Sequence, residues 1–447
     1  MLTFLRKKMK TIMIVVAVLF VASMFYGISA TRWRGGGGET SRDLAKVNGK
    51  AIDPLRYREM FSRMVNQLGG EIRPQDAAFV QNLALGQTID FTLILDQAKK
   101  KVKVPNREVD AVIDNLVQQQ KLGSKKELER ILKRSGLSMG KFKEMIRDEM
   151  LVQKMVSKVR GDAKVTPEDL REVRASHILL SSEADAKRVL EKVRKGEDFS
   201  ALAREYSMDP GSAGKGGDLG YFTTGSMIEP FEKKAFSLKV GEVSDAVKTQ
   251  FGYHIIKVTD TRLREFGDKK EDVEKAALQE KQEKAFQRWF SDLKSKARIE
   301  IISPELKAHD LRFRGKAWEA IQEYKKAISQ NPYNPYLHLY LADCYGSVGK
   351  TDDALSEYQA AVEAGKGEPL LYLILAEAYQ KAGKTDQAIA QYRLASMVAG
   401  DDKALHERLL KTFRDLRAGA EVAREKAEIL RIEKKEKFEK ELKGEGK

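Results

Sequence analysis

The chain has 447 residues but only one cysteine, Cys344, so it cannot form an internal disulfide. No group of cysteines and histidines has metal-ligand spacing, and we expect neither a metal site nor a cofactor. The net charge of +15 is spread along charged helical segments without an aromatic stripe, which argues against nucleic-acid binding. The simplest interpretation of Cys344 is a small buried residue of a helical core.

The N-terminus contains the longest run without charge. Thr11–Ala30 is uncharged and follows Arg6, Lys7, Lys8 and Lys10, and a run of about 20 apolar residues is long enough to span a membrane as a helix. Gly27–Ser29 also has the small residues of a signal-peptide cleavage site, so removal of the segment stays open. The basic residues favour a single-pass anchor in the inner membrane.

Three fragments between Arg174 and Asp260 carry most of the functional information. They are Ala175–Leu179 (ASHIL), Gly216–Gly220 (GGDLG) and Gly252–Ile256 (GYHII). His177 and His254 each lie in an alternating apolar run typical of a strand. The glycine-rich stretch between them is incompatible with regular structure and predicts a shaped loop beside the sheet.

In this order the fragments resemble parvulin-type peptidyl-prolyl isomerases over residues 174–260, with a predicted β-α-α-β-α-β-β unit. The resemblance implies that the proline ring is received by three apolar side chains and that four polar residues form the catalytic group. The apolar residues are Leu219, Met227 and Phe231, and the polar ones are His177, Asp209, His254 and Thr249. Phe251 is a departure, because some relatives have serine there.

The implied chemistry requires no covalent bond to the substrate. Rotation about an X-Pro bond crosses a barrier of about 18 to 20 kcal/mol because amide resonance is lost. A site that holds the ring and stabilises the twisted amide lowers this barrier. Residues 180–185 read LSSEAD and lack the arginine or lysine cluster that pairs a phosphate, so we do not expect phosphoserine-proline specificity.

The region from 44 to 170 has helical patterns and loosely resembles the N-terminal chaperone region of the SurA, PpiD and PrsA class of exported folding factors. Its methionines suggest either a soft client-binding surface or core packing, and core packing is the favoured interpretation. They are Met60, Met64, Met139, Met145, Met150 and Met155. By the same resemblance, the helix and strand at 263–302 return to this region, which makes the isomerase unit an insert.

The last third repeats with a period of 34 residues. Glycine, alanine and tyrosine recur in step at Gly315, Gly349 and Gly383, at Ala308, Ala342 and Ala376, at Ala320, Ala354 and Ala388, and at Tyr324, Tyr358 and Tyr392. The pattern resembles the tetratricopeptide repeat, whose stacked units form a concave surface for a protein partner. A structural spacer is the alternative. The charged tail that follows is either a solvated helix or disordered.

We therefore predict a multidomain α+β protein with a transmembrane helix, a helical SurA-like chaperone domain, a parvulin α/β domain and an α-solenoid of repeats. The predicted segments are a cytoplasmic tail and signal-anchor (1–34), a glycine-rich linker (35–43), the chaperone domain (44–170), the isomerase domain (171–262), the returning helix and strand (263–302), the repeats with a capping helix (303–430) and the tail (431–447).

The predicted function is that of a membrane-anchored prolyl isomerase and chaperone, with most of the chain on the periplasmic or extracytoplasmic side. Its substrates would be unfolded or translocating polypeptides with X-Pro bonds, and a protein partner would bind the concave face of the repeats. One alternative is a non-catalytic, membrane-tethered holdase or scaffold. A second is an adaptor that faces the cytoplasm.

Overall fold

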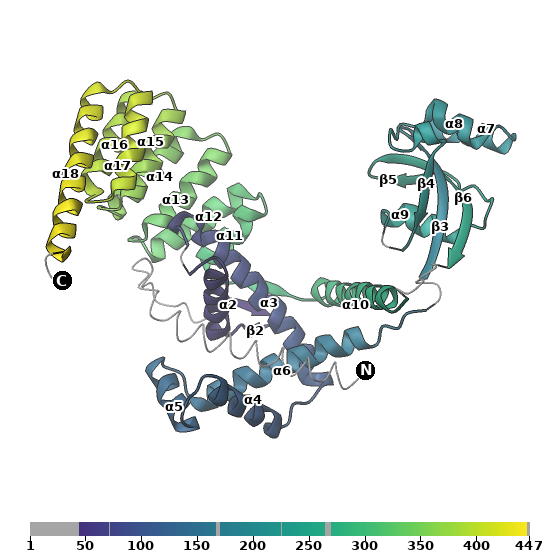
Figure 1. Ribbon diagram of the computed structural model, residues 1–447, viewed down its shortest axis with the longest axis horizontal. Coiled ribbons are helices and arrows are strands. Elements are labelled where there is room, and N and C mark those ends of the chain that lie inside the picture. Colours follow the sequence, from purple (N-terminus) through teal and green to yellow (C-terminus); the bar gives the residue numbers. More distant parts are fainter. Residues whose placement is uncertain (1–43, 71, 167–169, 225, 264–269, 445–447) are drawn as a thin grey trace. The chain divides into compact units, whose positions relative to one another are not determined.

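A computed structural model of the chain describes residues 44–444, apart from 71, 167–169, 225 and 264–269 (Figure 1). The fold is mostly helical with two small sheets, and it divides into two compact units. One contains the residues up to Lys154 together with Leu293–Lys447, and the other is Met155–Asp292. The apolar run at 11–30 lies outside the described residues.

A three-stranded sheet in the first unit joins distant parts of the sequence. Strands β1 (Ala45–Val47) and β2 (Lys50–Ala51) form a hairpin, and β7 (Ile299–Ile301) pairs antiparallel with β1. Asn48 and Gly49 have φ values of 52° and 82°, as a type I′ turn requires. The segment after residues 171–263 thus returns to the first strand of the described part of the chain.

The helices of residues 54–161 begin at residues that cap them. Asp53 accepts a hydrogen bond from the Leu55 amide at the start of α2, and Ser124 accepts one from Glu127 at the start of α5. The elements are α2 (Pro54–Gln67), the 3-10 turn η1 (Pro74–Asp76), α3 (Ala77–Lys101), α4 (Asn106–Gln119), α5 (Lys125–Arg134) and α6 (Met139–Gly161). Among the described residues, Pro74–Lys101 is long and apolar enough to cross a membrane, and 56% of its apolar window is buried within the protein.

The methionines of this region fill the helical core, as the favoured interpretation predicted. Four of them are buried, namely Met60, Met145, Met150 and Met155. Met64 and Met139 are partly buried. The alternative of a methionine-rich client surface is therefore wrong for the four buried side chains.

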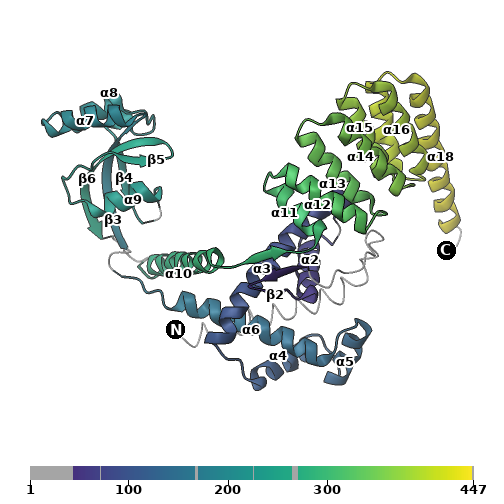
Figure 2. The ribbon, with the colours of Figure 1, turned by 180° about the vertical axis from the view of Figure 1, so that it is seen from behind.

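The second unit is built on a four-stranded antiparallel sheet with strand order β4-β3-β6-β5 (Figures 1 and 2). Helices α7 and α8 pack on one face through Ile178 and Ile255, and α9 packs on the other through Ala175 and Ile256. The elements are β3 (Arg171–Leu180), α7 (Glu183–Arg194), α8 (Phe199–Tyr206), η3 (Ala213–Lys215), β4 (Asp218–Phe222), α9 (Glu229–Ser237), β5 (Val247–Thr249), β6 (Gly252–Leu263) and the following α10 (Lys270–Ser295).

The repeats are antiparallel helix pairs that stack through small residues. Their turns contain Gly315, Gly349 and Gly383, with φ between 73° and 77°, a conformation that L side chains rarely adopt. Ala308, Ala342 and Ala376 are fully buried, as is expected where helices approach closely. The helices are α11 (Pro304–Phe313), α12 (Ala317–Gln330), α13 (Pro335–Ser347), α14 (Thr351–Ala364), α15 (Pro369–Lys381) and α16 (Thr385–Val398).

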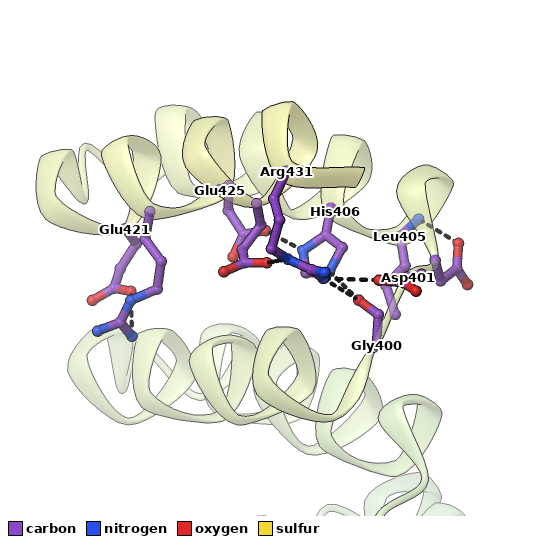
Figure 3. A network of polar contacts seen from close by, with 10 residues as sticks. Gly400, Asp401, Leu405, His406, Glu421, Glu425 and Arg431 are labelled. Carbon is purple, nitrogen blue, oxygen red and sulfur yellow. Dashed lines mark hydrogen bonds and ion pairs between the residues drawn. The ribbon is translucent and has the colours of Figure 1, made fainter. Parts of the chain in front are cut away.

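The array ends with α17 (Lys403–Asp415) and the long α18 (Gly419–Gly444), which polar contacts fix to the preceding loop (Figure 3). His406 Nδ1 lies 2.6 Å from Glu425 Oε2, and Arg431 and Lys435 pair with Asp401. Ile432 is buried. These contacts extend the helix past residue 430, so the described part of the tail is helical rather than disordered.

Candidate active site

Strand alternation brings the two histidines to the face of the sheet that α9 covers. Successive side chains of a strand point to opposite faces, so His177 shares a face with Ala175, and His254 with Ile256. In the register of β3 and β6, His177 is opposite Ile256, and His254 is opposite Leu179. The histidines are therefore diagonal neighbours on adjacent strands, a spacing that large side chains can bridge.

A continuous polar chain runs through both imidazoles. Asp209 Oδ2 is 2.8 Å from His177 Nε2, the two Nδ1 atoms of His177 and His254 are 3.1 Å apart, and His254 Nε2 is 2.9 Å from Thr249 Oγ1. Both rings are buried, with 6% and 4% exposure. All four residues that the resemblance assigned to catalysis thus lie in one line.

Hydrogen-bond logic assigns the protons when both rings are neutral. An ionised carboxylate only accepts, so His177 Nε2 carries the hydrogen that is donated to Asp209. His177 Nδ1 is then an acceptor and receives the hydrogen of His254 Nδ1. His254 Nε2 in turn accepts the hydroxyl hydrogen of Thr249. Each ring nitrogen has a partner in this tautomer, which avoids the cost of a buried unsatisfied group.

The pKa values of Asp209 and His254 support this assignment. Hydrogen bonds from Ser212, from His177 and from the Gly211 amide lower the pKa of Asp209 to about 2. Burial, with a smaller contribution from His177, lowers the pKa of His254 to about 4. At neutral pH the chain therefore holds an anionic carboxylate at one end and a neutral imidazole within it.

Phe231 connects the polar chain to an apolar cluster. Its ring centroid lies 5.6 Å from that of His177 and 5.4 Å from that of His254, with the planes nearly perpendicular. Leu219 and Met227 are partly buried members of the same cluster, whereas Phe231 is 3% exposed. Leu219 and Met227 are therefore more accessible than Phe231 within this cluster. The structure brings together all three residues that the resemblance assigned to the proline ring.

The glycine-rich loop lies directly against β3. The Gly217 carbonyl accepts a hydrogen bond from the His177 amide at 2.8 Å, and a Cβ atom at Gly217 would be 2.3 Å from the His177 carbonyl oxygen. Gly217 also has a φ of 80°. No other residue combines this conformation with such close approach, so the loop sequence fixes the backbone beside the first histidine.

Sequence reasoning missed Ser212. Its hydroxyl donates to Asp209 Oδ2 and lies 3.1 Å from His177 Nε2, and the side chain is 2% exposed. The only signal in the sequence was its position three residues after Asp209 in a Pro-Gly turn, because a tight turn can bring the side chains at its two ends together. Phe251 stands where some relatives have serine, and its ring is exposed. Its backbone amide donates to Thr249 Oγ1 at 3.1 Å, so the polar contact at this position is made by the backbone.

Residues 156–262, which contain this arrangement, match the family described as the PPIC-type PPIase domain. Residues 1–156 match the SurA-like N-terminal domain, and residues 323–356 match the tetratricopeptide repeat. The foldase protein PrsA of Caldanaerobacter subterraneus subsp. tengcongensis is 32% identical over 314 residues, which cover 65% of this chain and 97% of that protein.

The chain belongs to the PrsA foldase family. A second relative, the foldase protein PrsA of a Geobacillus species, is 40% identical over 254 residues, covering 54% of this chain and 89% of that protein. The crystal structure of the peptidylprolyl isomerase PrsA from Bacillus anthracis is 32% identical, covers 45% of this chain and 94% of that one, and has a TM-score of 0.27. The family match and these relatives identify the chain as a peptidyl-prolyl cis-trans isomerase of the parvulin type.

Proposed function

We propose that Leu219, Met227 and Phe231 receive the proline ring while the amide that rotates lies over the histidine pair. The support is the order of side chains on one face of the sheet. The apolar cluster that contains Ala175 and Phe231 lies beside the imidazoles of His177 and His254, and the Phe231 ring contacts both of them. A proline ring and its preceding amide are likewise adjacent, so one substrate orientation satisfies both surfaces.

Asp209 then acts through its charge. A planar amide carries partial negative charge on its oxygen, and this charge decreases when rotation removes the resonance. An ionised carboxylate near that oxygen therefore destabilises the planar state more than the twisted one, which is a differential effect of the kind that catalysis requires. A thousandfold acceleration needs only about 4 kcal/mol of such preference.

The histidines and Thr249 hold this charge in place. Each member of the chain from Thr249 to Asp209 fixes the orientation of the next, and no proton transfer to the substrate is needed. We therefore assign His177, His254 and Thr249 a positioning role within the catalytic group, and Asp209 the electrostatic role. The observation that carries this proposal is the convergence of the charged chain and the apolar cluster at Phe231.

The test is cis-trans isomerisation of a proline tetrapeptide by the full chain. We expect turnover by the wild type and its loss in the Phe231→Ala/His254→Ala double variant. Because Phe231 is buried, circular dichroism and a melting curve must show that the variant folds. Glu229→Ala, at an exposed residue of the same helix, is the matched control and should retain full turnover. Turnover that survives the double variant would exclude this site.

We further propose that residues 11–30 anchor the protein in the cytoplasmic membrane and that the rest of the chain lies on the extracytoplasmic side. The uncharged run supports a membrane span. Four basic residues precede it and Arg32, Arg34 and Arg42 follow it, so the extracytoplasmic side is argued from the resemblance to exported isomerases rather than from charge. The domain at 171–262 would act on unfolded or translocating polypeptides, the domain at 44–170 would hold them, and the repeats at 303–430 would recruit a protein partner.

Protease added to spheroplasts tests this topology. Extracytoplasmic exposure predicts digestion of the chain after residue 40, whereas a protein that faces the cytoplasm would stay intact until the membrane is permeabilised. A cytoplasmic protein of the same cells must remain undigested in both arms, which controls for lysis.

A further inference from the structure

Helix α3 begins without a capping side chain of its own. Asp76 occupies the N-cap position, but its backbone is helical and its side chain makes no capping hydrogen bond. The first turn of a helix contains backbone N–H groups without intrahelical partners. Ala77 and Ala78 in this turn are at most 1% exposed, so solvent water has little access to them. The turn η1 runs directly into α3, and the Ala77 amide donates to the Pro74 carbonyl oxygen within this segment.

The second repeat contacts the start of this segment through a buried tyrosine. Tyr340 on α13 donates its hydroxyl hydrogen to the Pro74 carbonyl oxygen at 2.9 Å, and the backbone of Ala78 lies beside the same phenol. Tyr340 is 2% exposed. One phenol of the second repeat is therefore hydrogen-bonded to the turn η1, although 266 residues separate Tyr340 from Pro74.

The first repeat contacts the same segment through a second buried polar link. His309 on α11 is fully buried, with Nε2 3.0 Å from Gln81 Oε1 and Nδ1 2.8 Å from the Tyr324 hydroxyl oxygen. Because an amide oxygen only accepts, Nε2 of His309 carries the hydrogen and Nδ1 accepts from Tyr324. The link from α12 through α11 to α3 thus leaves neither ring nitrogen unsatisfied.

Apolar contacts surround these polar links. Ala78 belongs to the same buried cluster as the core of the repeats, and the ring of Phe79 meets that of Phe313 edge-on at 5.6 Å. A larger side chain at position 78 would have to displace atoms of this cluster. The contact thus combines small side chains, one backbone carbonyl and one amide side chain, all from residues 74–81.

We propose that α11 and α13, the first helices of repeats one and two, form an internal docking surface for residues 74–81. This segment of the chaperone domain is the N-terminal cap of the repeat array. Solenoid arrays need terminal caps because their end units otherwise expose apolar surface, and α18 follows the array at its other end. Residues 74–81 occupy α11 and α13, so an external polypeptide partner can bind only the first helices of the later pairs, α15 and α17.

Hydrogen-deuterium exchange of the full chain tests the docking surface. Ala78→Arg places a long charged side chain at the buried contact, and we expect the amides of α11 and α13 to exchange roughly tenfold faster or more. Gln87→Arg adds the same side chain at an exposed position of the same helix and should leave these rates unchanged. The strands β3 and β6 of the other unit should keep wild-type rates in both variants.

A substitution in the repeats tests the same contact if Ala78→Arg disrupts the N-terminal helices themselves. Tyr340→Phe removes one oxygen atom, and the amides of residues 74–81 should then exchange about fivefold faster, as expected for the loss of a buried hydrogen bond. Unchanged protection of residues 74–81 in Tyr340→Phe, or of α11 and α13 in Ala78→Arg, would overturn the proposal.

Discussion

The lowered pKa of His254 predicts a defined loss of stability in mild acid. Burial lowers this pKa from 6.5 to about 4. Between these values the unfolded chain takes up a proton at His254 and the folded chain does not, so the free energy of unfolding falls as the pH decreases from 6.5 to 4. The shift corresponds to about 3 kcal/mol, and because solvent near the site screens part of it, we expect about 2 kcal/mol.

Hydrogen exchange of β3 and β6 amides in the full chain, corrected for intrinsic rates, measures this change at pH 7, 6, 5 and 4.5. This pH range avoids the titration of Asp209. Its pKa is lowered from 3.8 to about 2, so Asp209 changes the free energy of unfolding mainly between pH 3.8 and pH 2. His254→Asn removes the titrating group and should flatten the profile at a lower overall stability. A flat wild-type profile, or an equal slope in the variant, would refute this account.

Three further predictions concern the same unit. Met227→Ala should lower kcat/KM for a proline peptide about tenfold, mainly through KM, because about 1.5 kcal/mol of apolar contact is lost; an unchanged KM would contradict the assigned contact. Gly217→Ala should cost more than 3 kcal/mol in thermal unfolding, since its Cβ would lie 2.3 Å from a β3 carbonyl, whereas Gly214→Ala meets nothing within 4 Å and should be neutral. Thr249→Val should cost about 1 to 2 kcal/mol by leaving a buried ring nitrogen unsatisfied, and Thr249→Ser should not.

Local patterns were sufficient to predict much of the isomerase unit. The alternating runs around His177 and His254 predicted strands, and the structure has them as β3 and β6. The glycines between Asp209 and Gly220 predicted irregular backbone, and Gly216 and Gly217 both have positive φ. The prediction is wrong from Asp218 onward, because strand β4 begins there and pairs with β3. These features depend on the steric preferences of a few adjacent residues, which the sequence displays directly.

Contacts between distant segments were not predictable in the same way. For Ser212 the only signal was its position three residues after Asp209 in a Pro-Gly turn, because the loop has no periodicity that shows where the hydroxyl points. The contact of Tyr340 with Pro74 depends on how two helical regions approach each other, and an amphipathic pattern shows that a face is buried but not what covers it. The helical tail at 431–444 is fixed by ion pairs with Asp401 that no local pattern contains.

The single cysteine gives this protein an intrinsic reporter. Cys344 is 2% exposed on α13, and burial raises the pKa of its thiol to about 11, so an alkylating reagent finds almost no thiolate in the native state. It lies one helical turn beyond Tyr340, on the same side of the helix. The rate at which iodoacetamide alkylates Cys344 in the unaltered chain therefore reports how often the second repeat opens. Mass spectrometry measures this rate as the fraction of chains that carry the label.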